Sequence, residues 1–143
     1  MSKNLKDIVF TSALRTPIGK FKGLWRKSQA YQLGKIVILN ILQQTKIKPK
    51  FIDEIIMGQV LTGGAGQNPA RQAAIAAGIP VEKTAYVINQ VCGSGLRSIA
   101  AGYQSILLNE SKIVIAGGQE SMTNSNNEMM LKDGLIDAYN NYH

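Results

Sequence analysis

Short apolar runs alternate with longer segments of helical periodicity along this chain, and this alternation restricts the fold more than any other feature. The apolar runs lie at residues 7–13, 54–60, 85–89 and 112–116. Apolar runs of this length are typical of parallel strands that are covered on both faces. Alternating strands and helices predict an α/β fold, with a mostly parallel sheet, right-handed crossovers and helices on both faces.

Capping residues mark two of the helices. The first helix is predicted from Ser28, with an apolar stripe, and it is expected to stop at Pro49. The second is predicted to begin at Pro69, because Asn68 is a favourable N-cap residue and proline is tolerated in the first helical turn. Gly78 follows its predicted end. A glycine-rich loop precedes this helix, and it lacks the Gly-Lys-Ser/Thr ending of a phosphate-binding P-loop.

The only cysteine, Cys92, lies where the strand at residues 85–89 turns into the third helix, which is predicted to run to about Leu108. The N-terminus of a helix has unpaired N–H groups and a partial positive charge, and both favour a thiolate over a thiol. Gly93 and Gly95 have no Cβ, so a substrate could approach the sulfur closely. Position alone leaves two interpretations open: a nucleophile, or a small buried hydrophobic residue.

The third helix also carries a long apolar pattern. Its members are Leu96, Ile99, Ala100, Tyr103, Ile106 and Leu107. Because they recur at three- and four-residue spacing, they share one face of the helix.

Composition narrows the class of protein. A hydrophobic content of 45% and a charged content of 17% are typical of a globular protein, and no apolar run approaches the ~18 residues of a membrane span. The net charge is +7, but the basic residues are scattered along the chain, so nucleic-acid binding is not expected. The polar start lacks the apolar region of a secretory signal, and one cysteine cannot form an intramolecular disulfide. A cytoplasmic location is therefore expected.

Residues 89–96, with the sequence NQVCGSGL, resemble the nucleophile segment of the thiolases, the acetyl-CoA acetyltransferase group. Further segments resemble thiolase motifs in thiolase order, and they lie at residues 15–21, 57–60, 66–72 and 116–122. The resemblance implies the amino-terminal half of a layered α/β/α/β/α fold. It also implies that residues 1–122 form the nucleophile-bearing half-domain and that residues 123–143 begin a loop domain.

The resemblance further implies an acyltransferase. Cys92 would form an acyl-enzyme from an acyl-CoA, for Claisen condensation of acetyl-CoA or thiolysis of a 3-ketoacyl-CoA, with no cofactor or metal. The backbone N–H of Cys92 could stabilise the oxyanion. His143 matches a histidine that lines the acyl-pantetheine pocket in thiolases, although a frayed terminal residue is the favoured interpretation for this chain. Arg71 would order loops rather than act in catalysis. Fatty acid metabolism and a homodimeric or homotetrameric assembly are implied as well.

Thiolases are longer than this chain, and their second half carries a catalytic histidine, an asparagine and a second cysteine that are not found in this sequence. One alternative is therefore an incomplete fragment, or one subunit of a split enzyme. A second is a condensing enzyme of the related ketoacyl synthases. A third is a non-catalytic interaction module.

Overall fold

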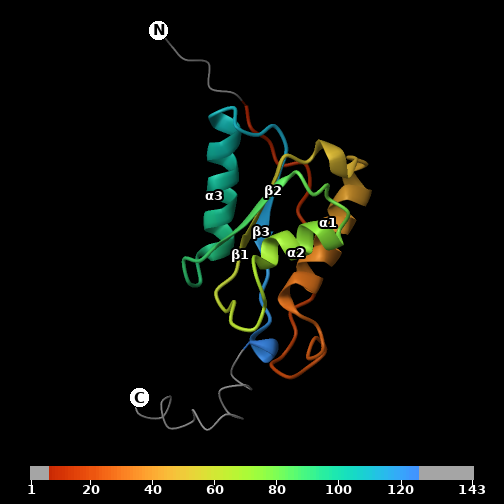
Figure 1. Cartoon of the computed structure of the whole chain (residues 1–143), viewed down its shortest axis with the longest axis vertical. Coiled ribbons are helices and arrows are strands. Elements are labelled where there is room, and N and C mark those ends of the chain that lie inside the picture. Colours follow the sequence, from red (N-terminus) through yellow and green to blue (C-terminus); the bar gives the residue numbers. More distant parts are fainter. Residues whose placement is uncertain (1–6, 126–143) are drawn as a thin grey trace.

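The computed structural model describes residues 7–125, in which three parallel strands form one sheet (Figure 1). The strands are β1 (Glu54–Gly58), β2 (Thr84–Ile88) and β3 (Val114–Gly118). Their order is β2-β1-β3, so β1 is central, and the register pairs Glu54 with both Thr84 and Val114. The predicted parallel α/β fold is confirmed.

Helices cover both faces of this sheet. They are α1 (Ala30–Thr45), α2 (Pro69–Ala76) and α3 (Ser94–Leu107). Helices α1 and α2 pack against each other on one side, and α3 lies on the other side against β1 and β3 (Figure 1). Two short 3₁₀ turns, η1 (Pro49–Phe51) and η2 (Met122–Asn124), complete the described elements. None of the helices within residues 7–125 is long and apolar enough to cross a membrane.

Helix α2 has the predicted caps. The Asn68 side-chain oxygen accepts the Arg71 N–H at 3.1 Å, and Pro69 occupies the first turn. Gly78, just beyond the helix, has a φ of +83°, a left-handed conformation that glycine adopts without strain. The Arg71 guanidinium donates to the carbonyls of Val81 (2.7 Å) and Lys83 (3.0 Å), so it orders the loop before β2, as expected.

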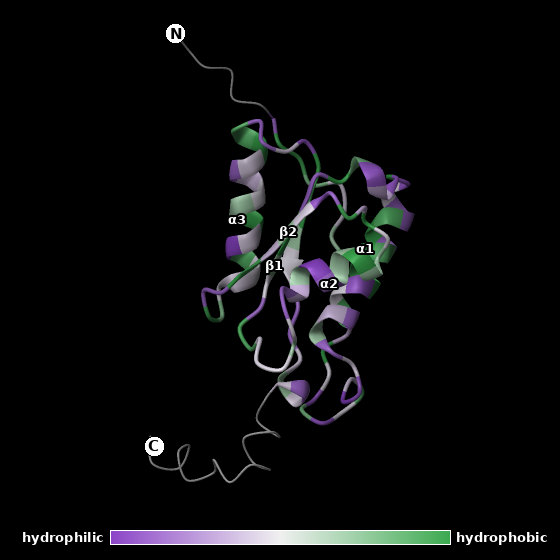
Figure 2. Cartoon of the chain, viewed as in Figure 1, coloured by the Kyte–Doolittle hydropathy of each residue, from purple (hydrophilic) through white to green (hydrophobic). Residues whose placement is uncertain are grey.

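The hydrophobic core lies between the sheet and the α1–α2 pair. In β1, Ile55 and Met57 belong to this core, and Ile55 is completely buried. Helix α1 contributes Ile38, and α2 contributes small residues such as Ala73, which bring the helix close to the sheet. Figure 2 shows hydrophobic residues on α1 where it lies beside α2. Burying each large aliphatic side chain contributes about 1.5–3 kcal/mol. Helix α1 ends at Thr45, before Pro49. Lys46, which follows Thr45, has a φ of +56°, and this left-handed conformation ends the helix.

The strand predicted at residues 7–13 is wrong. Residues 7–20 contain no helix or strand, and the side chains of Val9 and Phe10 are 72% and 80% exposed. A strand needs a neighbour that accepts its backbone hydrogen bonds, and within residues 7–125 both outer strands pair only with β1. The segment instead lies along α1, where the Ser12 hydroxyl donates to the Gln44 side chain at 2.9 Å.

One further expectation also needs correction. Gly117 and Gly118 were expected to form a turn, but both pair with β1 as the end of β3.

The apolar stripe of α3 is not its buried face, since Leu96 is 73% exposed. The residues that α3 buries are Ser94, Ser98, Gly102 and Ser105. A Cβ at Gly102 would lie 3.0 Å from a Val114 methyl group, so small residues let α3 approach the sheet closely.

Candidate active site

The turn between β2 and α3 presents the thiol of Cys92. Strand β2 ends at Ile88, Gly93 is the N-cap residue of α3, and Cys92 directly precedes it. The Cys92 side chain is a free thiol and is exposed. The predicted position at a strand–helix turn is therefore confirmed, and the alternative of a small buried hydrophobic residue is wrong.

Val91, the residue before the cysteine, has a φ of +48°. A β-branched residue rarely adopts this left-handed conformation, which costs of the order of 1–3 kcal/mol. Hydrogen bonds on both sides hold it there. The Val91 N–H donates to the Asn89 side-chain oxygen at 3.0 Å, and the Val91 carbonyl accepts the Ser94 N–H at 3.1 Å. These hydrogen bonds thus stabilise the strained backbone conformation next to Cys92.

Ser94 closes this turn from the helix side. Its hydroxyl accepts the Gln90 N–H at 2.8 Å and donates to the Val91 carbonyl at 2.6 Å. The Gly93 N–H donates to the Gln90 carbonyl at 3.0 Å. Sequence reasoning did not single out Ser94. The signal that could have found it is a serine at the start of a helix, where its hydroxyl can satisfy backbone groups that the helix leaves unpaired.

Gly58, the last residue of β1, packs tightly against the backbone of another element. A Cβ at Gly58 would overlap the Ser94 backbone and lie 2.5 Å from the Gly95 nitrogen. A Cβ at Gly95, by contrast, would meet nothing nearer than 3.8 Å. The first turn of α3 therefore rests directly on the end of β1, and Gly58 is the glycine that this contact requires.

The carboxyl ends of all three strands are tied together at this edge of the sheet. The Glu120 carboxylate, just after β3, accepts the N–H groups of Val60 (2.8 Å) and Leu61 (3.2 Å), which follow β1. The Val60 carbonyl accepts from the Asn89 side chain at 3.2 Å. Because Asn89 also accepts the Val91 N–H, a chain of hydrogen bonds runs from β3 through the loop after β1 to the cysteine turn.

A buried pair of amides lies beneath this chain. The Gln119 side chain donates to the Gln59 side-chain oxygen at 2.9 Å, and Gln59 donates to the Leu61 carbonyl at 3.0 Å. The side-chain oxygen of Gln119 is buried and has no hydrogen-bond partner among residues 7–125, and it lies against Gly34, where a Cβ would collide with it. The glycine in the middle of α1 is thereby explained.

Beside the turn, a cavity of about 400 Å³ opens between the ends of β1 and β2 and the start of α2. Gln59, Asn68 and Asn89 are among the residues that line it, and Cys92 is not. Within residues 7–125, no hydrogen bond reaches the Cys92 sulfur, and no group of three or more His, Cys, Asp or Glu side chains could hold a metal ion. His143, the only histidine of the sequence, lies outside the described residues.

The chain is similar in sequence to a protein family and to several known proteins. The family model "Thiolase, N-terminal domain" matches residues 8–133. An acetyl-CoA acetyltransferase of Paracoccus denitrificans is 46% identical over 94% of this chain, and a probable acetyl-CoA acyltransferase of Staphylococcus aureus is 44% identical over 95% of it. The chain spans 39% of the length of each of these relatives.

A solved structure agrees with the fold. The crystal structure of the Bacillus anthracis acetyl-CoA acetyltransferase superposes with a TM-score of 0.79 at 36% sequence identity. The superposition covers 82% of this chain and 30% of that one.

Proposed function

The chain belongs to the thiolase family, and on that premise we propose that Cys92 is the nucleophile of a thiolase-type acyltransferase. The observation that carries the proposal is the exposed thiol of Cys92, held by a hydrogen-bonded turn at the N-terminus of α3. The substrates are acyl-CoA thioesters, in agreement with the names of the relatives.

The first half-reaction exchanges one thioester for another. The Cys92 thiolate attacks the thioester carbonyl carbon, a bond forms between this carbon and the Cys92 sulfur, and the carbon–sulfur bond to coenzyme A breaks. Coenzyme A leaves as a thiolate and takes up a proton. The backbone N–H of Cys92 is a candidate donor to the oxyanion that develops. The acyl group then passes to the carbon nucleophile of a second acyl-CoA, or back to coenzyme A.

The other catalytic groups are assigned outside the described residues. The base that activates Cys92 and a second acid–base cysteine come from thiolase sequence that this chain does not contain. His143, also outside the described residues, is proposed to line the acyl-pantetheine pocket.

Organisation and context follow from family membership as parts of the same proposal. Residues 1–122 form the nucleophile-bearing half-domain, and residues 123–143 begin a loop domain. The complete protein acts in fatty acid metabolism in the cytoplasm as a homodimer or homotetramer. Its partners are acyl-CoA molecules rather than nucleic acid or membrane.

Intact-protein mass spectrometry after brief incubation with acetyl-CoA tests the role of Cys92. The wild-type chain is expected to gain one acetyl group, and the Cys92→Ser variant is expected to gain none. An adduct of equal yield in both proteins would refute the proposal, because the acetyl group would then lie elsewhere.

A second candidate function is an incomplete thiolase, or one subunit of a split enzyme. The observation in its favour is that the chain spans 39% of the length of its relatives. Mixing the chain with a polypeptide that carries the remaining thiolase sequence tests it. Restored thiolysis of acetoacetyl-CoA supports a split subunit, whereas no restoration from two folded polypeptides contradicts it. The thiolase family match disfavours the ketoacyl-synthase alternative.

A further inference from the structure

We propose that a second cavity, at the amino ends of the strands, binds a small molecule that combines phosphate groups with a flat apolar group, such as a nucleoside diphosphate. The cavity has a volume of about 570 Å³ and lies between the end of α1, the η1 turn and the starts of β2 and β3. Cys92 is at the carboxyl ends of the strands, and five-residue strands are about 17 Å long. The cavity is therefore distinct from the cysteine turn.

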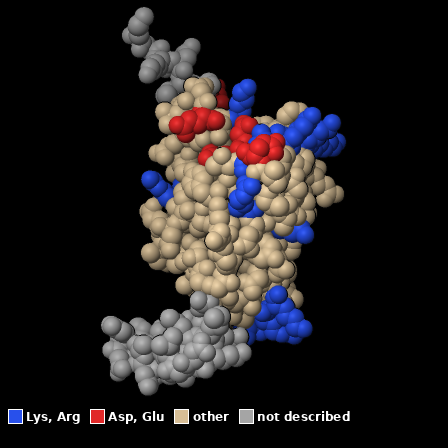
Figure 3. All heavy atoms as spheres, viewed as in Figure 1, with Lys and Arg blue, Asp and Glu red and all other residues tan. Residues whose placement is uncertain are grey.

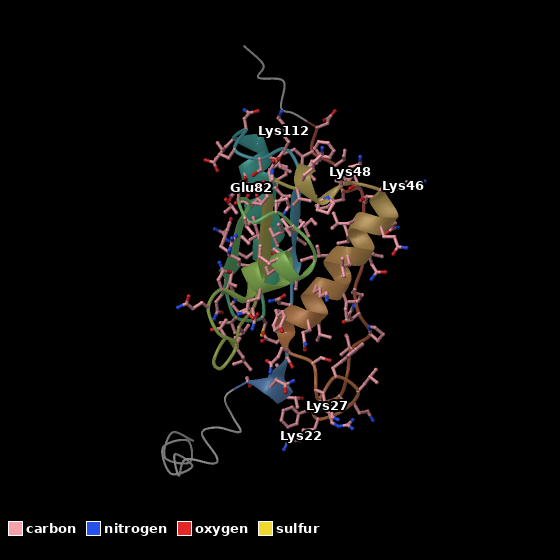
Figure 4. All side chains as sticks on the ribbon, turned by 45° about the vertical axis from the view of Figure 1, so that its right-hand side comes forward. Lys22, Lys27, Lys46, Lys48, Glu82 and Lys112 are labelled. Carbon is pink, nitrogen blue, oxygen red and sulfur yellow. The ribbon has the colours of Figure 1, made fainter. Side chains whose placement is uncertain are left out.

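Lysines that are far apart in the sequence converge on this cavity. They are Lys46, Lys48, Lys50, Lys83 and Lys112, and the only acidic residue that lines the cavity with them is Asp53. Figure 4 shows Lys46, Lys48 and Lys112 at the same end of the molecule, with Lys22 and Lys27 at the opposite end. The fold thus gathers five of the scattered lysines around one cavity.

The carboxylate of Asp53 neutralises only part of this charge. It accepts the backbone N–H groups of Lys112 (2.8 Å) and Ile113 (3.1 Å), and it pairs with the Lys83 ammonium at 3.5 Å. In the described part of the chain this is the only ion pair, so the other four lysines that line the cavity have no carboxylate partner. Figure 3 shows both acidic and basic residues on the surface at this end of the molecule. Glu82 lies at the same end (Figure 4) but is not one of the residues that line the cavity.

Unpaired lysines around a concavity concentrate anions. The positive potentials of neighbouring lysines add together, and the low-dielectric walls of a cavity focus this potential, so the local concentration of anions rises. Each ammonium group is a point charge with three rotatable N–H donors, and such groups bind phosphate oxygens without a fixed geometry. Four lysines without a carboxylate partner match the charge of a diphosphate better than that of a single carboxylate.

The cavity also has an apolar part, which an inorganic anion would not use. Ile47, Phe51 and Ile113 line it, and the Phe51 side chain is 54% exposed. The Lys50 ammonium lies 5.1 Å from the centroid of the Phe51 ring, so a charged group and an aromatic surface are adjacent. The volume falls within the range of small-molecule sites, roughly 300–1,000 Å³. An organic phosphate with a flat ring satisfies both parts of the cavity.

Calorimetric titration of the full chain with ADP, and separately with inorganic pyrophosphate, tests the proposal. ADP is expected to bind with a dissociation constant of the order of 100 μM at low salt, and pyrophosphate about tenfold more weakly. The paired substitution Lys48→Glu and Lys112→Glu is expected to weaken ADP binding at least about tenfold. The matched control, Lys22→Glu with Lys27→Glu, reverses two charges at the opposite end and is expected to leave binding within about twofold.

Three titration results would overturn the proposal. The first is that ADP shows no saturable binding to a folded chain. The second is that the control substitutions at Lys22 and Lys27 weaken ADP binding as much as those at Lys48 and Lys112. The third is that pyrophosphate binds with the same affinity as ADP. The Cys92→Ser variant should bind ADP like the wild type, so failure of this site and failure of the proposed acyl transfer can be told apart.

Lysine footprinting of the wild-type chain does not depend on how the variants fold. Acetylation with a soluble anhydride, followed by peptide mass spectrometry, reports which lysines ADP protects. Protection of Lys46, Lys48 and Lys112 supports the site. Protection at the cysteine end of the sheet, or no protection at saturating ADP, contradicts it.

Discussion

Val91 and Ser94 determine how the chain turns before it enters α3. Val91 carries backbone strain at a φ of +48°, and Ser94 makes two side-chain hydrogen bonds that hold the turn closed. Strain of this kind persists only where surrounding contacts stabilise it, and it is frequent at catalytic turns. The position of Cys92 therefore depends on the two residues that shape the turn around it.

Replacing Ser94 with alanine tests this dependence. The loss of two buried hydrogen bonds should lower the free energy of unfolding by about 1–3 kcal/mol, as measured by urea denaturation. Acetyl transfer to Cys92 should become about tenfold slower, because the nucleophile is no longer held in one geometry.

Ser98→Ala is the matched control for that variant. The Ser98 hydroxyl is also buried on α3 and lies 2.5 Å from the Gly117 carbonyl oxygen, but it makes no bond to the turn. This variant should lose comparable stability and keep the wild-type acetylation rate. Equal slowing in both variants would mean that Ser94 acts only through general stability.

Gly58 gives a second prediction at the scale of one residue. Gly58→Ala should destabilise the chain by about 1–3 kcal/mol, because its methyl group would overlap the first turn of α3. Gly117→Ala, in the neighbouring strand, has no atom within 4 Å of the new Cβ and should be neutral or slightly stabilising. Thermal denaturation compares the two, and equal melting temperatures would contradict the close contact.

At the scale of elements, Asp53 joins β1 to β3. Its carboxylate accepts the Lys112 and Ile113 N–H groups immediately before β3. These hydrogen bonds, that from Lys112 first, together with Lys83, hold the pKa of Asp53 below its ordinary value of 3.8, although burial acts in the opposite direction. The contribution of Asp53 to stability is therefore complete above pH 3.8 and is lost as the pH falls through the lower pKa of the folded state.

Asp53→Asn should lower the free energy of unfolding by about 1–3 kcal/mol at neutral pH, because charge-assisted hydrogen bonds to two backbone N–H groups are weakened. Chemical denaturation should show that the difference from the wild type shrinks in acid, as the pH falls below 3.8 and through the lower pKa of the folded state, because Asp53 then becomes protonated in the folded chain as well. The exposed Asp7→Asn is the control and should have no effect at either pH. A difference that does not change with pH would contradict the pKa shift.

The elements with local signals were the ones that the sequence could predict. Asn68, Pro69 and Gly78 bound α2 correctly, because caps act within one turn of the helix. The buried face of α3 was not predictable by hydropathy, since the sheet contacts its serines and Gly102 while Leu96 faces outward. The strand at residues 7–13 failed because pairing depends on a neighbouring strand, which no local pattern reports.

The same limits applied to the candidate site. Cys92 was found from its place between a strand pattern and a helix pattern, which are both local. Glu120, Asn89 and Gly58 act across 29 to 60 residues of sequence, and only the fold shows that their strands end at one edge. The thiolase resemblance placed them within motifs without giving their contacts.

At the scale of the whole molecule, the described chain leaves large apolar surfaces uncovered. The exposed stripe of α3 includes Leu96 and Tyr103, and Phe10 and Ile18 are exposed near the start of the chain. Strands β2 and β3 are both edges of the described sheet, with backbone groups that can pair with another chain. We therefore expect the isolated chain to associate with itself.

Light scattering during incubation at micromolar concentration tests this expectation. Leu96→Gln combined with Tyr103→Gln should reduce scattering strongly without lowering stability, because both side chains are exposed. Val81→Gln, at another exposed position that is 69% accessible, should have a smaller effect. A wild-type chain that stays monomeric and unfolds cooperatively would contradict the expectation.

The central claim is that Cys92 carries the acyl group as a thioester, and peptide mapping after acetyl-CoA treatment tests it most directly. The chain is incubated with acetyl-CoA, quenched in acid, digested and analysed by mass spectrometry before and after neutral hydroxylamine, which cleaves thioesters. The account predicts one acetylated peptide, the one that contains Cys92, and complete loss of the acetyl group with hydroxylamine. An acetyl group on a lysine peptide that resists hydroxylamine, with Cys92 unmodified, would contradict it.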